Sequence, residues 1–147
     1  MGNDNRQFFS VRDDGTSAAI RWTYDPGSGS NKRMYSPAVY YDPTLSKFII
    51  VFTRNDGTLY ALRDDETSYT LLWSYSIGGD PESPPIIANG VVYVGSTNGI
   101  LSGIRLSDGI LLFTTDLGND NFTSFAVGHN LLFVGSDQNK IYAFGKP

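Results

Sequence analysis

The feature that most constrains this chain is an internal repeat. Residues 7–24 return at residues 58–75 with a constant offset of 51 positions. A second echo relates residues 92–96 to residues 132–136 with an offset of 40 positions. Repeats of 20 to 50 residues are typical of solenoids, propellers and other arrays, in which one supersecondary unit is used several times. The chain is therefore expected to consist of similar small units rather than one irregular core.

The composition indicates that these units are made of β-strands. The chain has 147 residues, enough for one domain, and contains 9 Tyr, 9 Phe, 2 Trp, 16 Gly and 7 Pro. Aromatic residues are enriched in strands, whereas Gly and Pro mark tight turns. No long segment has the apolar spacing of an amphipathic helix. The sequence predicts an all-β protein.

Each unit is predicted to hold four short strands in a meander. In residues 83–115, apolar runs alternate with the turn signals Asn89-Gly90, Asn98-Gly99 and Asp108-Gly109. Asn-Gly and Asp-Gly pairs tolerate positive φ and join neighbouring antiparallel strands by short hairpins. Successive strands of one unit should therefore lie side by side, without crossovers.

The same spacing divides the whole chain, residues 1–147, into one repeat region. Residues 36–75 and 83–115 are whole units, and residues 7–24 match only the third and fourth strands of a unit. Residues 123–144 match only the first three strands. The prediction is 13 strands, about three units' worth, with a part unit at each end.

Several short motifs recur at fixed places in these units. They are Ser83-Pro84 before the first strand, Val92-Tyr93-Val94-Gly95-Ser96 in the second, Asn98-Gly99 in the turn, Leu59-Tyr60-Ala61-Leu62 in the third, and Trp22 or Trp73 in the fourth. Together these motifs resemble the pyrroloquinoline-quinone-like β-propeller repeat. The resemblance covers nearly the whole chain and implies a β-propeller whose blades are four-stranded antiparallel meanders.

The resemblance also suggests which residues pack the blades together. An aromatic residue on the outer strand can cover the interface with the next blade, while a small residue on the third strand permits close packing. Trp22 and Trp73 fit the aromatic position, and Phe113 replaces the tryptophan in residues 83–115. The small residues are Ala61, Gly103 and Ala143. We predict that Trp22, Trp73 and Phe113 are blade-packing residues.

The number of strands raises the question of how the propeller is completed. Propellers typically have 4 to 8 blades, and about three blades alone would leave apolar faces and strand edges uncovered. The leading hypothesis is a six-bladed ring of two chains. The alternatives are that the chain is part of a longer propeller, or a structural subunit that assembles through open blade edges.

The sequence offers little to support catalysis or cofactor binding. A net charge of −4 and a pI near 4.7 argue against nucleic acid as a partner. There is no cysteine, and no apolar segment reaches the length of a membrane span. The acidic pairs at residues 13–14 and 64–65 follow third strands, where turn formation explains them. We therefore expect no catalytic residue, metal ligand or cofactor.

The expected function is a non-enzymatic module for protein binding or assembly. Candidate interaction residues lie in equivalent loops at one rim: Asn55, Asp56, Asn98, Gln138 and Asn139. The alternative is a fragment or degenerate relative of a quinone-dependent dehydrogenase, which the resemblance would associate with pyrroloquinoline quinone and calcium. That family's enzymes carry a vicinal cysteine pair, which this chain lacks. The resemblance slightly favours the cell envelope or an extracellular location, although composition alone leaves the compartment unknown.

Overall fold

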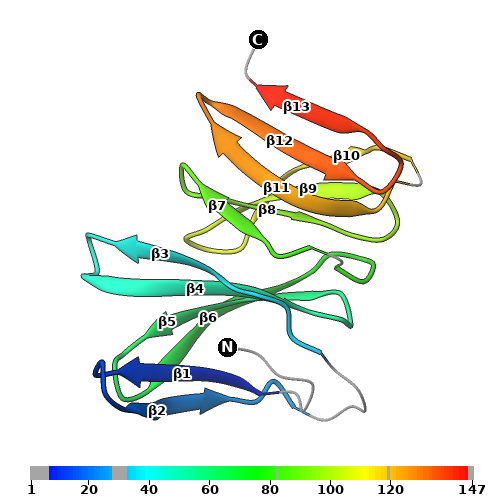
Figure 1. Cartoon of the computed structure of the whole chain (residues 1–147). Helices are drawn as coiled ribbons and strands as arrows, with labels where there is room; N and C mark the ends of the chain where they lie inside the picture. The colour runs from blue at the N-terminus through cyan, green and yellow to red at the C-terminus, as the bar shows by residue number, and fades with distance from the viewer. Residues whose placement is uncertain (1–6, 28–32, 82, 119, 146–147) are drawn as a thin grey trace.

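The structure is a computed structural model, and it describes residues 7–27, 33–81, 83–118 and 120–145. These residues form 13 strands in four separate antiparallel sheets, numbered I to IV here in chain order (Figure 1). Sheet I consists of β1 (Phe8–Asp13) and β2 (Ala18–Tyr24). Sheet II consists of β3 (Ala38–Asp42), β4 (Lys47–Arg54), β5 (Thr58–Asp64) and β6 (Tyr69–Ser76).

Sheets III and IV follow the same plan. Sheet III consists of β7 (Ile86–Ala88), β8 (Val91–Gly95), β9 (Ile100–Arg105) and β10 (Leu111–Asp116). Sheet IV consists of β11 (Phe122–Gly128), β12 (Leu131–Ser136) and β13 (Ile141–Gly145). Within each sheet the strands are paired in chain order. The prediction of an all-β protein built from four-stranded antiparallel meanders is confirmed.

Proline shortens the first strands of the two complete sheets. The sequence pattern places these strands at Ser36 and Ser83, but β3 begins at Ala38 and β7 begins at Ile86. Pro37, Pro84 and Pro85 have no backbone N–H to give to the sheet. Continuous pairing of β3 and β7 therefore starts after the last proline of each segment, although before Pro37 Met34 forms an isolated bridge with Arg54 and Tyr35 N donates to Thr53 O at 3.0 Å.

The hairpin turns have the backbone conformation that their residues favour. Asn89 and Gly90 have φ angles of 51° and 75°, as a type I′ turn between β7 and β8 requires. The corresponding turn of sheet IV uses His129 and Asn130, with φ angles of 50° and 63°. His129 is thus an exposed turn residue.

The four sheets are stacked face to face in chain order, with sheet I at one end and sheet IV at the other (Figure 1). We call the face toward the preceding sheet the leading face and the face toward the following sheet the trailing face. The first strands lie at the centre of the arc, where β7 is beside both β3 and β11. This radial arrangement of twisted sheets is that of propeller blades.

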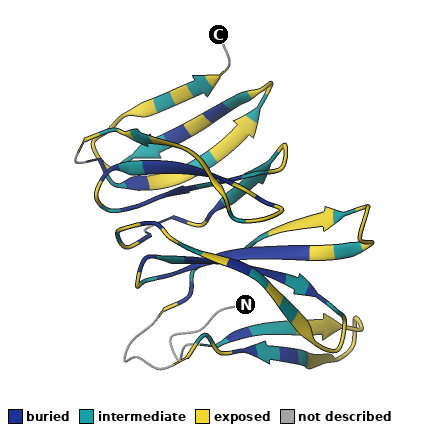
Figure 2. Ribbon diagram, turned by 180° about the vertical axis from the view of Figure 1, so that it is seen from behind, coloured by how far each residue is buried: buried dark blue, intermediate teal, exposed yellow. Residues whose placement is uncertain are grey.

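Strand β4 shows how one strand joins two interfaces. Its residues 49–52 are all buried, and their side chains alternate between the two faces of sheet II. Ile50 and Phe52 pack with sheet I, whereas Ile49 and Val51 pack with sheet III. Figure 2 shows the result, with buried residues concentrated in the inner sheets and much exposed surface on sheet IV.

Candidate interaction surfaces

The turns between the second and third strands lie along one rim of the stack, together with the segments that lead from one sheet to the next. We call this edge the connection rim. Its three equivalent turns are residues 55–57, 97–99 and 137–139. Backbone hydrogen bonds tie them to the connecting segments, from Thr97 N to Asp80 O at 2.9 Å and from Asp137 N to Asn121 O at 3.0 Å. The turns therefore form a fixed polar edge.

The structure places all five predicted interaction residues on this rim. Asp56, Asn98, Gln138 and Asn139 are exposed, and Asn55 is half-buried. Asp56 also pairs with the buried Arg54, with Nε and Oδ2 3.3 Å apart. The rim brings together residues that are far apart in the sequence, as the repeat predicted.

Two of the turns require glycine because a connecting segment crosses over them. Gly57 and Gly99 both have φ +77°, and their carbonyl oxygens accept hydrogen bonds from Ile77 N and Leu117 N. A Cβ on Gly99 would lie 1.6 Å from the carbonyl oxygen of Gly118. The equivalent residue in sheet IV is Asn139, with φ 59°. Among the described residues sheet IV has no fourth strand, and no segment of this kind covers its turn.

A buried carboxylate fixes the connection between sheets III and IV. Asp120 is 4% exposed and accepts hydrogen bonds from Ser136 Oγ at 3.1 Å, Lys140 Nζ at 3.2 Å and Tyr142 Oη at 2.5 Å. The bond from Tyr142 is the main cause that lowers the pKa of Asp120, and the same cluster raises the pKa of Lys140. Asp120 therefore remains ionised and anchors β12 and β13 to the preceding connection.

The predicted packing tryptophans each reach the following sheet. Trp22 of β2 donates from Nε1 to Asp64 Oδ1 of sheet II at 2.9 Å. Trp73 of β6 donates from Nε1 to the carbonyl oxygen of Leu106 after β9 at 2.8 Å. Opposite them on the neighbouring third strands are the small residues Ser10 and Ala61. The two indoles thus combine apolar burial with one directed hydrogen bond each.

Phe113 lies in the equivalent place on β10 but makes different contacts. It is opposite Gly103, where an added Cβ would be 2.2 Å from the phenyl ring. The ring is 40% exposed and its centroid is 6.2 Å from that of Tyr93 in the same sheet. Phenylalanine has no N–H, so this position provides no hydrogen bond to sheet IV.

The acidic pairs after the third strands have separate structural roles. Asp64 is buried and also accepts from Arg21 Nη1 at 3.0 Å and from the backbone of Glu66 at 2.9 Å. Asp65 accepts from Arg63 and Thr70, and the bond from Arg63 is the main cause that lowers its pKa. The two carboxylates close turns and bind partners within the protein.

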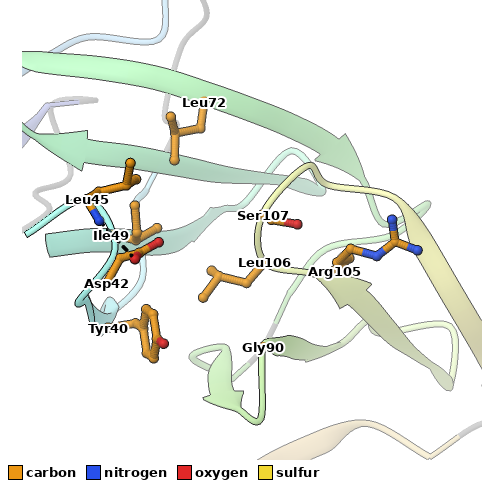
Figure 3. Close-up of a pocket in the computed structure, with 9 residues that line it drawn as sticks. All are labelled: Tyr40, Asp42, Leu45, Ile49, Leu72, Gly90, Arg105, Leu106 and Ser107. Atoms are coloured by element: carbon orange, nitrogen blue, oxygen red, sulfur yellow. Dashed lines mark hydrogen bonds between the residues drawn. The ribbon is translucent and has the colours of Figure 1, made fainter. Parts of the chain in front are cut away.

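A pocket of about 420 Å³ lies between sheets II and III at the opposite rim (Figure 3). Its apolar lining comes from Leu45, Ile49, Leu72 and Leu106, and its polar lining from Tyr40, Asp42, Arg105 and Ser107. The two charged residues already have partners: Asp42 accepts from the backbone of Thr44 and Leu45, and Arg105 pairs with Asp108 at 2.9 Å. The pocket is of ligand size, but its two charged lining residues are already engaged in contacts within the protein.

Two kinds of feature are not found in the part of the chain that the structure describes. Across residues 7–27, 33–81, 83–118 and 120–145, no three His, Cys, Asp or Glu side chains gather as a metal site would require. The same residues contain no helix that could cross a bilayer.

Comparison with known proteins supports the propeller fold. The chain is similar to BamB from Moraxella catarrhalis, with a TM-score of 0.63 and 12% identity, covering 99% of this chain and 49% of that one. It is also similar to BBS1N in a complex with ARL6DN, with a TM-score of 0.71 and 17% identity, covering 98% of this chain and 45% of that one. A computationally designed protein, Ika4, has a TM-score of 0.63 and 15% identity, covering 86% and 72% of the two chains.

One curated protein is related in sequence over a short segment. The outer membrane protein assembly factor BamB of Moranella endobia is 33% identical over 48 residues, which is 33% of this chain and 12% of the relative. No family model matches the chain. The match therefore spans about an eighth of the relative, and this chain spans about half of the two natural propeller chains.

The sequence did not reveal the roles of Asp120 and of Gly95, which forms with Phe122 a contact that we call the aromatic socket. The partners of Asp120 lie 16 to 22 positions away, and no local motif joins them. Gly95 was visible only as part of a repeated Val-Gly-Ser motif. In the structure its missing side chain makes room for Phe122, because an added Cβ would be 2.1 Å from that ring. The recurrence of glycine at position 135 was the available signal.

Proposed function

We propose that this protein is a non-enzymatic β-propeller module that binds another protein through its connection rim. The observation that carries the proposal is the row of three equivalent turns, which presents Asp56, Asn98 and Gln138 from three successive sheets. Hydrogen bonds to the connecting segments hold these turns in place. A rigid polar edge of this kind can recognise a partner with little loss of conformational entropy on binding.

The charge of the rim indicates the chemistry of the partner. Asp80, Asp116 and Asp137 are exposed on the rim turns or on the adjoining segments, besides Asp56, which pairs with Arg54. Their carboxylates favour a partner surface that carries Lys or Arg, because complementary charge speeds association and helps to set specificity. The partner expected here is a folded protein or a peptide with a basic face.

The similar proteins are consistent with such a role. The related BamB is named as an assembly factor for outer membrane proteins, and the structure of BBS1N is that of a complex with ARL6DN. Both names refer to an association with other proteins and not to a catalysed reaction. They support a protein partner for this chain, and the first supports a location in the cell envelope.

We also propose that the propeller is completed, by a second copy of the chain or by further blades of a longer protein. A third possibility is that the protein is a structural subunit, and that many copies of it assemble through the open edges of their blades. The dehydrogenase alternative would require the chain to hold pyrroloquinoline quinone. Retention of the quinone absorbance after dialysis would favour that alternative over the binding module.

The rim proposal is tested by adding charge to one rim at a time. The double variant Asn98→Lys, Gln138→Lys changes exposed residues of the connection rim, whereas Thr44→Lys, Thr67→Lys adds the same charge at exposed turns of the opposite rim. A partner captured by the unmodified protein from an envelope extract is identified, purified and titrated against all three proteins. The rim variant should bind at least tenfold more weakly, and the control variant should bind as the unmodified protein does. Equal binding by all three would contradict the proposal.

A further inference from the structure

We propose that a second copy of this chain completes sheet I, by docking its sheet IV on the part of the leading face of sheet II that sheet I leaves bare. The inference makes the proposed ring completion specific, and it is independent of what binds the connection rim. We call this contact the seam. It joins the leading face of sheet II in one copy to the trailing face of sheet IV in the other. Two copies would therefore form two identical seams and close a ring.

The first side of the seam is an exposed apolar patch on β3 and β4. Val39, Tyr41 and Phe48 are 57%, 50% and 48% exposed. The rings of Tyr41 and Phe48 contact each other at a centroid distance of 5.2 Å. These three residues share the leading face with Ile50 and Phe52, because Val39 is paired with Ile50 and Tyr41 with Phe48.

The patch is bare because sheet I has only two strands among the described residues. Strands β1 and β2 take the third and fourth positions of a blade, so they cover only the part of sheet II that lies opposite those positions. Ile50 and Phe52 are buried there against Phe8 and Trp22. The patch continues this established interface toward the missing first and second strands. It is the remaining half of a blade contact.

The second side of the seam is the trailing face of sheet IV. Phe133 and Ile141 lie on this face and are 38% and 80% exposed. The residues at the position of Ile141 in the other sheets are Phe8, Leu59 and Leu101, by strand register and by the repeat. All three are at most 2% exposed, because the next sheet covers them. The same position in sheet IV therefore lacks the cover that every other sheet has.

The two sides fit by the rule that already holds within the chain. Each of the three internal interfaces packs the trailing face of one sheet on the leading face of the next. Sheet IV ends in such a trailing face and contains a first and a second strand, β11 and β12. These are the two strand positions that sheet I leaves open in the part of the chain that the structure describes. Simple stacking of sheet IV on sheet I would bring only third strands face to face and would leave the Tyr41 patch bare.

The complement of strands points to a second copy as the occupant, because sheet IV provides the first and second strand positions that sheet I does not fill within the described residues. Strands β1 and β13 hold equivalent third positions, so one of them must leave when the seam closes. The experiment below uses side chains of β4 and β12, which keep their places in either case.

The test is the solution mass of the full chain and of two single variants. Phe133→Lys places a charge on the trailing face of sheet IV, and Phe48→Glu places the opposite charge on the patch. Sedimentation equilibrium should give twice the 16.1 kDa chain mass for the unmodified protein. Each variant alone should be a monomer, with the dimer weakened at least a hundredfold.

Mixing the variants distinguishes this seam from other contacts. In an equimolar mixture, one seam brings the introduced lysine against the introduced glutamate and the other pairs two unmodified faces, so the dimer should return. Ile110→Lys serves as the matched control, because Ile110 is 52% exposed and lies outside both faces. It should leave the dimer unchanged. Ala126→Lys is a second variant of the same face, on β11 opposite Phe133, for use if Phe133→Lys fails to fold by circular dichroism.

Three results of the mass measurements would overturn the seam, and a fourth would overturn closure by two copies. A monomeric unmodified protein at all concentrations would overturn the seam, as would a dimer that persists in both folded variants or fails to return on mixing. A mass that keeps growing with concentration would overturn closure by two copies. None of these results depends on rim binding, so the seam and the proposed partner site can fail separately.

Discussion

The interfaces between sheets I and II and between sheets III and IV have the same geometry but are secured at different points. Between I and II, the rings of Phe8, Trp22 and Phe52 cluster, and the indole of Trp22 bonds to Asp64. Between III and IV, Phe122 fills the space above Gly95 at the start of the first strand. The stacking of the sheets is thus the same at both interfaces. The aromatic residue that secures the contact lies on a fourth strand in Trp22 of β2 and on a first strand in Phe122 of β11.

Phe113 leaves the junction of sheets III and IV without the indole hydrogen bond that Trp22 and Trp73 make at the other two junctions. Its position in the sheet is that of Trp22 and Trp73, but it cannot donate a hydrogen bond to the next sheet. The buried carboxylate of Asp120 provides polar anchoring at the same junction instead. The indole hydrogen bond is absent at Phe113, and the hydrogen bonds of Asp120 on the connection rim are present at the same junction.

The largest expected effect comes from breaking the aromatic socket. Phe122→Ala should lower the free energy of unfolding by about 3–5 kcal/mol, because it removes a fully buried ring and leaves a cavity. Urea denaturation measures the change. Gly95→Ala in the Phe122→Ala background should cost less than in the unmodified protein, because the added methyl group then has room. Additive losses in the double variant would show that the two residues are not coupled.

A smaller effect is expected at the tryptophan end of the stack. Asp64→Ala should cost about 1–3 kcal/mol, because it leaves the indole N–H of Trp22 buried without an acceptor. Thermal unfolding of Asp64→Ala and of Asp65→Ala provides the matched comparison. Asp65 binds Arg63 and Thr70 near the surface, so its replacement should cost less. Equal losses would remove the special role given to Asp64.

The third prediction concerns pH and the junction of sheets III and IV. Because the pKa of Asp120 is lowered by folding, its contribution is fully present above the unfolded carboxyl pKa of about 3.9. That contribution is lost as the pH falls through the lower folded pKa. Asp120→Asn should therefore be less stable at neutral pH and should show a flatter decline of stability between pH 5 and about pH 2. Urea titrations across this range test it, and parallel curves for the two proteins would contradict it.

The smallest effect is expected in the turn of sheet IV. Asn139→Gly should change the free energy of unfolding by less than about 1 kcal/mol, since both residues accept positive φ. Gly99→Asn, which copies this turn into sheet III, should be far more damaging because Gly118 O occupies the space for a side chain. Similar stabilities of the two variants would show that the connecting segment does not constrain the turn.

Much of the fold could be predicted from the sequence because the information is local and repeated. Asn89-Gly90 identifies a hairpin by its backbone preference alone, and the alignment of Trp22 with Trp73 places both on fourth strands. The predicted starts of the first strands, at Ser36 and Ser83, were less accurate than the turns. The pattern of apolar residues runs through the prolines, but proline has no N–H to donate within a sheet.

The side-chain contacts between sheets could not be predicted in the same way. Asp64 and Asp65 look alike in the sequence, yet only Asp64 meets an indole from another sheet. The partners of Asp120 come together only after β12 and β13 have paired. The five rim residues could be placed because turns follow the repeat, and whether they bind a partner is a proposal for experiment.

The stacking of the sheets in chain order is tested most directly by nuclear Overhauser effects between rings and backbone protons of different sheets. The structure predicts contacts between the rings of Phe8 and Phe52, between Trp73 Hε1 and Leu106, and between Phe122 and the α-protons of Gly95. Observation of all three would establish the three interfaces in solution. Strong effects between paired strands of each sheet, with none between sheets, would contradict the propeller arrangement.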